Sequence, residues 1–470
     1  MSSVNSASKF RVAIIGGGMG GLVLGLCLKK YALDVQFDIY ESAAKLTEVG
    51  AGVLMSPRIW TIMQELELEE ELVKVTGAVD RAGMLPLMNL RMINTDENHA
   101  GSDILFRKGD EAKVVDIVKL HQLHTFQRSV LQQILSEKLD AKDRIHFSKR
   151  LTSYSEPTSP TEPIILHFKD GTTATCDIVI GSDGIRSSVR RTMFAKLSDE
   201  SERHGHIEDA SRFRVMVEPI WSGHVTYRGL ILASELSEDL RRFASTPQIL
   251  CGKDRHVVLY PVSGGELVNI VSSVYTPGSG TVYDGPWVET TTSDKVAKLF
   301  EGFNPNAVAL IKSLREPLGW ALHTVPKLTT YIKGRSALIG DAAHAMVPYQ
   351  GAGLGQAIED GFVLAKILAH SSVTLTNVSE ALRIYDDVRR PFSQNVQQGS
   401  EWNGMLYQLR RAGWEDISVE DSAAGRYPPE LLSAFEKDVK AQMEWQYDPG
   451  ASIKGDIAKV SGMLETLSAQ

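Results

Sequence analysis

A glycine-rich turn directly after the first apolar stretch constrains this chain more than any other feature. Residues 10–15 are apolar and rich in β-branched side chains, and residues 16–21 read Gly-Gly-Gly-Met-Gly-Gly. A leucine-rich segment follows at 22–31, and residues 35–40, Val-Gln-Phe-Asp-Ile-Tyr, are typical of a second strand. We therefore expect a strand, a turn, a helix and a second strand within about thirty residues. This order is typical of a parallel sheet covered by helices.

The glycines in this turn have the spacing that a phosphate-binding turn needs. Gly16 permits a tight turn, Gly18 lets the backbone approach a pyrophosphate, and Gly21 lets the helix pack closely on its strand, with Gly20 beside it. The free N–H groups at the helix start favour an anion by roughly 0.3–2 kcal/mol. Glu41 ends the second strand, where an acid accepts the hydroxyls of an adenosine ribose and disfavours a 2′-phosphate. The sequence thus predicts FAD or NAD rather than NADP in this turn.

Two later motifs decide between FAD and NAD. Residues 178–190 run from an apolar strand through Asp183-Gly184 to a basic helix start, and residues 334–345 run from a strand into Gly340-Asp341. They resemble the Asp-Gly and Gly-Asp motifs of class A FAD-dependent aromatic monooxygenases, which have the para-hydroxybenzoate hydroxylase fold. The resemblance implies that the first motif lies near both FAD and NAD(P)H. It also implies that the aspartate of the second motif contacts the riboflavin part of FAD.

Further features extend the resemblance over residues 10–395. Arg128 opens a predicted helix at 128–139, where the family has a flavin-contacting arginine. Residues 48–52 follow the first βαβ unit, residues 348–353 lie beside the expected isoalloxazine position, and residues 385–391 close the resemblance after Glu359-Asp360. The cofactor-binding residues that the resemblance implies are Gly16, Gly18, Gly20, Gly21, Glu41, Gly52, Arg128, Asp183, Gly184, Gly340, Asp341, Gly351, Ala352 and Gly353.

The resemblance and the strand pattern together predict an α/β fold. We expect a Rossmann-like FAD-binding domain of the GR2 type that is discontinuous in sequence. Short apolar runs after residue 205 predict an inserted, mainly antiparallel β-sheet substrate domain, and the end of the chain is helical. The expected parts are the FAD-binding domain at 8–80, at 81–204 with a small substrate-side insertion and at 326–375, the substrate domain at 205–325, and the C-terminal helical region at 376–470.

The resemblance also implies a reaction. In this family NADH or NADPH reduces FAD, O2 adds at flavin C4a, and the hydroperoxide transfers one oxygen to an electron-rich aromatic ring. Residues 227–229, 320–323 and 355–356 are most similar to those of salicylate hydroxylases and related phenolic-acid hydroxylases. We expect hydroxylation of a phenolic acid, with or without oxidative decarboxylation. The alternatives are an enzyme that hydroxylates or dearomatises a phenolic polyketide or other secondary metabolite, and a non-catalytic flavin-binding protein.

Four residues are candidates for the substrate side of the site. An activated substrate is a phenolate or an aniline, so a polar or cationic group is expected to meet its phenol or carboxylate. Arg228 and Tyr260 lie on consecutive predicted strands, and His323 follows a tryptophan on a later one. Pro348 is expected to shape the cavity. The alternatives are that the arginine pairs with a local acid, that the tyrosine packs in the sheet, and that the histidine is structural.

Composition excludes several other classes of protein. The net charge of −8 argues against a general affinity for nucleic acid or anionic membranes. Three scattered cysteines do not suggest disulfides, and a reducing compartment fits them best. No signal peptide, apolar run of membrane-spanning length or metal-ligand cluster is visible. We therefore expect a cytoplasmic monomer or homodimer with a small aromatic substrate, no stable membrane association, no nucleic-acid partner and no metal.

Overall fold

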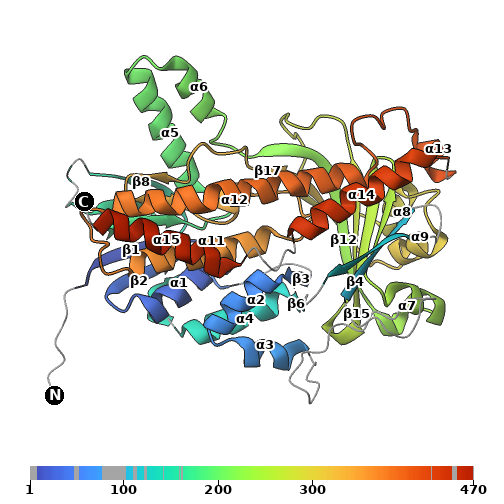
Figure 1. The fold of residues 1–470 in the computed structure, drawn as a ribbon, viewed down its shortest axis with the longest axis horizontal. Coiled ribbons are helices and arrows are strands. Elements are labelled where there is room, and N and C mark those ends of the chain that lie inside the picture. The colour runs from blue at the N-terminus through green and yellow to red at the C-terminus, as the bar shows by residue number, and fades with distance from the viewer. Residues whose placement is uncertain are drawn as a thin grey trace.

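The protein is described by a computed structural model in which two sheets are joined by long helices (Figure 1). The description covers residues 8–46, 52–76, 102–108, 114–120, 124–140, 142–157, 159, 162–424, 426–446 and 452–468. Within these ranges, no helix is long and apolar enough to cross a membrane. The three cysteines are free and buried.

The first sheet has six strands in the order β18-β19-β11-β1-β2-β7. The pairs β1–β2, β1–β11, β11–β19 and β2–β7 are parallel, and β18–β19 is antiparallel. In chain order the strands are β1 (Phe10–Ile15), β2 (Val35–Tyr40), β7 (Ile145–His146), β11 (Ile178–Gly181), β18 (Ile332–Lys333) and β19 (Ser336–Leu338). Segments more than three hundred residues apart therefore share one sheet, which confirms the discontinuous FAD-binding fold.

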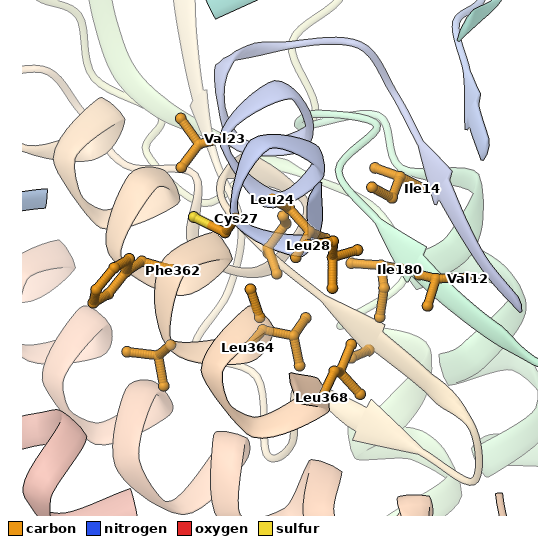
Figure 2. Close-up of a cluster of buried hydrophobic side chains, with 14 of the residues drawn as sticks. Val12, Ile14, Val23, Leu24, Cys27, Leu28, Ile180, Phe362, Leu364 and Leu368 are labelled. Carbon is orange, nitrogen blue, oxygen red and sulfur yellow. The ribbon is translucent and has the colours of Figure 1, made fainter. Parts of the chain in front are cut away.

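Two helices cover this sheet and form the main core with it. Figure 2 shows Val23, Leu24, Cys27 and Leu28 of α1 (Met19–Tyr31) with Phe362, Leu364 and Leu368 of α11 (Gly353–Ala369), beside Val12, Ile14 and Ile180 of the strands. All ten side chains are at most 1% exposed. The remaining helices on this half are α2 (Pro57–Glu65), α3 (Glu69–Thr76), α4 (Arg128–Leu139), α5 (Ser188–Arg203), α6 (Ile207–Arg214), α10 (Asp341–His344) and α15 (Ile453–Ser468).

The second sheet has eight strands in the order β16-β17-β12-β15-β14-β13-β4-β5, and every pairing but β13–β4 is antiparallel. One face packs on α7 (Glu238–Ala244), α8 (Ser293–Leu299) and α9 (Pro305–Lys312), and the other faces α12 (Val378–Tyr407) and α14 (Pro429–Gln446). Its strands are β4 (Ser102–Lys108), β5 (Val114–Leu120), β12 (Ile220–Leu232), β13 (Gln248–Gly252), β14 (Arg255–Val262), β15 (Leu267–Tyr275), β16 (Val288–Thr290) and β17 (Leu318–Thr324).

Smaller elements complete the chain. Strands β8 (Leu151–Ser155), β9 (Ile164–Phe168) and β10 (Thr173–Cys176) form one antiparallel sheet, and β3 (Gly52–Met55) pairs with β6 (His124–Gln127). Helix α13 (Val419–Ala423) and the 3-10 turns η1 (Lys142–Arg144), η2 (Ala233–Glu235) and η3 (Ser263–Gly265) make up the rest.

The structure changes one detail of the strand pattern. The sequence of residues 173–180 predicts a single strand, but the chain forms two, divided at Asp177, whose carboxylate accepts a hydrogen bond from the Arg11 backbone and pairs with its guanidinium. Only the second half, β11, therefore joins the parallel sheet. Strands β4 and β5, within the 81–204 part for which a small substrate-side insertion is expected, belong to the second sheet. The exact domain boundaries stay a prediction.

Candidate functional site

The three glycine-and-acid motifs meet at one edge of the six-stranded sheet. Strands β1, β11 and β19 are direct neighbours, and their last residues are in register, with Ile15 opposite Gly181 and Gly181 opposite Leu338. Because carboxyl ends of parallel strands lie at the same edge, the segments that follow converge there. Strand β2 ends beside them, since Tyr40 is opposite Ile15.

The glycines of the first turn differ in what surrounds them. Gly16 has φ +107°, and a Cβ on it would lie 2.3 Å from the Ser182 carbonyl oxygen. A Cβ on Gly21 would lie 2.2 Å from the Gly16 carbonyl oxygen. Among the described residues, a Cβ on Gly18 would meet no atom within 4 Å, although Gly18 directly precedes α1. The first two glycines are thus required by packing, whereas Gly18 leaves open space at a helix N-terminus, as a bound pyrophosphate requires.

Glu41 is held beside this turn by hydrogen bonds that its own carboxylate accepts. Oε2 accepts from the Gly17 N–H at 2.7 Å, and Oε1 accepts from the Ala43 N–H at 2.7 Å and the Ser42 hydroxyl at 3.2 Å. The predicted ribose-binding acid is therefore fixed next to the glycines.

Asp183 and Gly184 of the second motif have different surroundings. The Asp183 carboxylate accepts from the Ser187 hydroxyl at 2.5 Å and from the Ser188 and Val189 N–H groups at 2.7 and 3.2 Å. Burial raises the pKa of this carboxyl, and the hydrogen bonds oppose that rise. Gly184 has φ +74°, and a Cβ on it would have no atom from the described part of the chain within 4 Å. The aspartate therefore shapes the start of α5, while the glycine leaves room for a ligand.

Gly340 and Asp341 form the third motif. Gly340 has φ +59°, and its N–H donates to Asp360 Oδ2 at 2.9 Å. Asp341, in the first turn of α10, is exposed, and no residue in the described ranges bonds to its carboxylate. An exposed carboxylate without a protein partner in the described ranges fits the predicted contact with the riboflavin part of FAD.

A buried charge network supports this third motif. Asp360 Oδ2 also bonds His344 Nε2 at 2.6 Å, and Oδ1 accepts from Arg389 Nε at 2.9 Å. Arg389 donates further to Glu359 at 2.8 Å and to Gln356 at 2.7 Å. Burial alone would raise the pKa of Asp360, but the charges of His344 and Arg389 lower it. The carboxylate and the guanidinium thus remain ionised.

The residues of this network are not among the predicted site residues, although Glu359-Asp360 and residues 385–391 belong to the resemblance. The sequence signal for the network is an adjacent pair of acids inside an otherwise apolar helix, because buried carboxylates need partners.

The turn before α11 presents backbone to the site and turns its aromatic side chain away. The Gly351 N–H donates to the Pro348 carbonyl at 2.9 Å, and both residues are exposed. Ala352 caps α11, which begins at Gly353. Tyr349 is buried, and its ring lies edge-on to His256 at 4.8 Å between centroids. A ligand that approaches the turn at 348–353 would therefore contact its backbone and Pro348.

Arg228 and Tyr260 lie on the same face of the second sheet, although their strands are not consecutive. Strand β13 comes between them in sequence and β15 between them in the sheet, which corrects the prediction. Val271 of β15 is opposite both Arg228 and Val258, and Tyr260 is two residues beyond Val258. Because side chains alternate along a strand, Arg228 and Tyr260 point to one side.

Their electrostatics show that these two residues are neighbours. Burial lowers the pKa of Arg228, while nearby Tyr260 raises it and the charge of Arg128 lowers it. Burial also raises the pKa of Tyr260, which Arg228 opposes. Within the described ranges no acid pairs with the half-buried Arg228, so the alternative of a local ion pair finds no support. Arg128, at the start of α4, thus lies close enough to the second sheet for its charge to act on Arg228.

His323 lies elsewhere on the second sheet. Its Nδ1 is 2.8 Å from the Ala321 carbonyl, its ring stacks on Trp287 at 3.6 Å, and Arg186 lies 3.9 Å from the centre of the same indole. Burial lowers its pKa, and Arg186 adds to the effect. Leu318, the partner of Arg228, is five residues away along β17, roughly 16 Å. The structure thus does not bring His323 to Arg228.

Comparison with known proteins identifies the cofactor. Residues 9–228 and 312–400 match the FAD binding domain family. The chain belongs to the FAD-binding domain family. That Gly18, Glu41 and Asp341 contact FAD stays a prediction. Residues 48–51, part of the resemblance, lie outside the described residues, whereas Gly52 begins β3.

Relatives of this FAD-binding protein are aromatic monooxygenases. It is 30% identical to a salicylate hydroxylase of Pseudomonas putida over 464 residues, 96% of this chain and 99% of that protein. It is 33% identical to a 6-methylsalicylate 1-monooxygenase of Aspergillus terreus over 400 residues, 83% and 81% of the two chains. A solved salicylate hydroxylase substrate complex matches with a TM-score of 0.76 at 29% identity, covering 96% and 98%. The protein is an FAD-dependent aromatic monooxygenase. In its described part, no cluster of His, Cys, Asp or Glu could hold a metal ion.

Two buried histidines make the stability of this FAD protein dependent on pH. His256 is 0% exposed, neither ring nitrogen has a hydrogen-bond partner in the described ranges, and burial lowers its pKa to about 3. Burial likewise lowers the pKa of His224 to about 4, against a hydrogen bond with Gln408. The unfolded chain takes up these protons below about pH 6.5, so stability falls as pH drops from there towards 4.

Between pH 7 and pH 5 we expect the wild type to lose about 2 kcal/mol more unfolding free energy than His256→Phe, because the variant lacks the titrating imidazole. The measurement is urea unfolding of both proteins at the two pH values. An equal loss in the wild type and the variant would show that His256 does not titrate in this way.

Proposed function

We propose that this FAD-dependent monooxygenase hydroxylates a phenolic aromatic acid, using NADH or NADPH and O2. The observation that carries the substrate class is Arg228, a half-buried guanidinium without an acid partner in the described ranges. A carboxylate on the substrate would supply the missing charge, and such a hydrogen bond contributes about 1.5–3 kcal/mol. The salicylate hydroxylase relatives support the same class.

Each residue has a separate task in this proposal. Arg228 binds and orients the carboxylate. Tyr260, whose pKa burial raises, stays protonated and donates a hydrogen bond to the substrate. The turn at Pro348 and Gly351 limits the space on the flavin side and excludes water. When bound, FAD accepts the hydride and activates oxygen. The contact of His323 with the substrate stays a prediction. Unchanged kinetics of a His323→Phe variant would contradict it.

A substrate panel tests the proposal. NADH and NADPH oxidation and O2 uptake are followed with phenolic acids, with matched phenols that lack the carboxylate, and with 6-alkylated phenolic acids. Mass spectrometry of the product separates addition of one oxygen from replacement of the carboxylate by a hydroxyl. Turnover of the carboxylate-free phenols alone would contradict the proposal. Preference for alkylated acids would favour the second candidate, a secondary-metabolite hydroxylase, which the 6-methylsalicylate relative supports.

Arg228→Ala is expected to raise KM for a phenolic acid by about 10- to 150-fold, which corresponds to the loss of one charge-assisted hydrogen bond. The matched phenol without a carboxylate should show little change, because the lost interaction is specific to the acid. Arg242→Ala is the control, since Arg242 is 68% exposed on α7. A similar loss for the acid and the phenol would place Arg228 in the fold rather than in substrate binding.

A cytoplasmic location fits the three free thiols and stays part of the proposal, as does a monomeric or homodimeric state. No nucleic-acid partner or stable membrane association is proposed.

A further inference from the structure

The C-terminal helix α15 is part of the FAD-binding half of the molecule. Ile453, Val460 and Leu464 are each 1% exposed and belong to the main core. The helix contacts α11, α12 and α2, and Figure 1 shows it alongside α12 and α11. The end of the chain thus packs against the helix that begins at the flavin-facing turn.

Asp456 of α15 reaches from this packing into the buried charge network. Its Oδ2 accepts from Arg58 Nη2 at 2.6 Å and is 4.0 Å from Arg389 Nη1. Arg58 also donates to both oxygens of Glu359, at 3.0 and 2.9 Å, and Arg389 shares that carboxylate. Asp456 is 25% exposed, whereas the Arg389 side chain is 0% exposed. It is therefore the outermost acid facing two closely spaced guanidinium groups.

The network leads from Asp456 to the third flavin motif. Arg389 holds Asp360, and Asp360 accepts from the Gly340 N–H, next to the exposed Asp341. Without the charge of Asp456, Arg58 and Arg389 would repel each other more strongly and compete for Glu359. Because buried charge networks respond as a unit, the strain would reach the Gly340 turn.

We propose that Asp456 is a positioning residue for FAD, through which docking of α15 and binding of FAD strengthen each other. The proposal rests on FAD binding and is independent of the substrate class. Coupling between two sites is reciprocal. If α15 raises the affinity for FAD, bound FAD must hold α15 more firmly.

The test uses the full-length protein stripped of FAD. We expect Asp456→Asn to weaken FAD binding by roughly tenfold in a fluorescence titration, and Asp456→Glu to restore most of the affinity. Glu465→Gln is the matched control: it removes the same charge from an exposed position of the same helix, so it should leave the FAD Kd within about twofold. An unchanged Kd for Asp456→Asn, or an equal loss for both variants, would overturn the proposal.

Hydrogen exchange tests the reciprocal effect in the wild-type protein, so the proposal does not depend on any variant folding. Amides of residues 453–468 should exchange more slowly when FAD is added, and this protection should be absent in Asp456→Asn. Exchange in α15 that does not respond to FAD in the wild type would refute the coupling.

Discussion

Replacing Gly18 by alanine is expected to weaken FAD binding by about tenfold or more without destabilising the protein. Gly18 has φ −70°, which alanine adopts freely, and an added Cβ meets no atom of the described residues within 4 Å. The apo-protein should therefore be unchanged or more stable by about 0.4–1 kcal/mol, because alanine restricts the unfolded chain. The methyl group would instead occupy the space that a pyrophosphate needs. FAD titration and urea unfolding of the apo-protein measure the two effects separately.

Gly16→Ala is the matched counterpart in the same turn. There the added Cβ would lie 2.3 Å from the Ser182 carbonyl oxygen, at φ +107°. The strain and the clash should cost about 2–5 kcal/mol of stability even without FAD. If Gly18→Ala bound FAD as the wild type does, the pyrophosphate could not lie at this helix N-terminus.

Arg389→Ala is expected to destabilise the protein by about 3–5 kcal/mol, because it leaves Asp360 and Glu359 buried without their shared partner. Denaturant unfolding of the apo-protein measures the loss. Arg383→Ala is the control on the same helix, since the Arg383 side chain is 66% exposed and lies 3.6 Å from the neighbouring Glu380.

A loss below about 1 kcal/mol for Arg389→Ala would show that water or local rearrangement replaces the guanidinium. In that case the Gly340 turn would not depend on the network. Arg389→Lys keeps the charge without the fork of donors, so we expect an intermediate loss.

The flavin half of the site could be predicted because its signals are local. The strand at 10–15, the strand at 35–40 and the helix at 128–139 have the predicted bounds in the structure. Glu41 lies beside the glycine turn for the same reason: one βαβ unit fixes where its second strand ends. Which residues of the three motifs contact FAD remains a prediction. The Gly18→Ala experiment tests it for the first motif.

The rest depends on contacts between distant segments. Arg228 and Tyr260 share a face because β15 lies between their strands in the sheet. No local sequence pattern predicts this strand order. Asp456 accepts a hydrogen bond from Arg58, which lies almost four hundred residues earlier in the sequence. The inward turn of Tyr349 likewise depends on the helix that receives its ring.

That helix, α12, has a consequence for protein engineering. It is 30 residues long, about 45 Å, and carries Arg389 on the flavin side. Farther along, Gly404 makes room for the Tyr349 ring, which a Cβ there would meet at 2.4 Å. Tyr349 in turn packs on His256 of the second sheet. A chimera that takes only the second sheet from a relative with another substrate would therefore separate matched surfaces, and α12 should be transferred together with it.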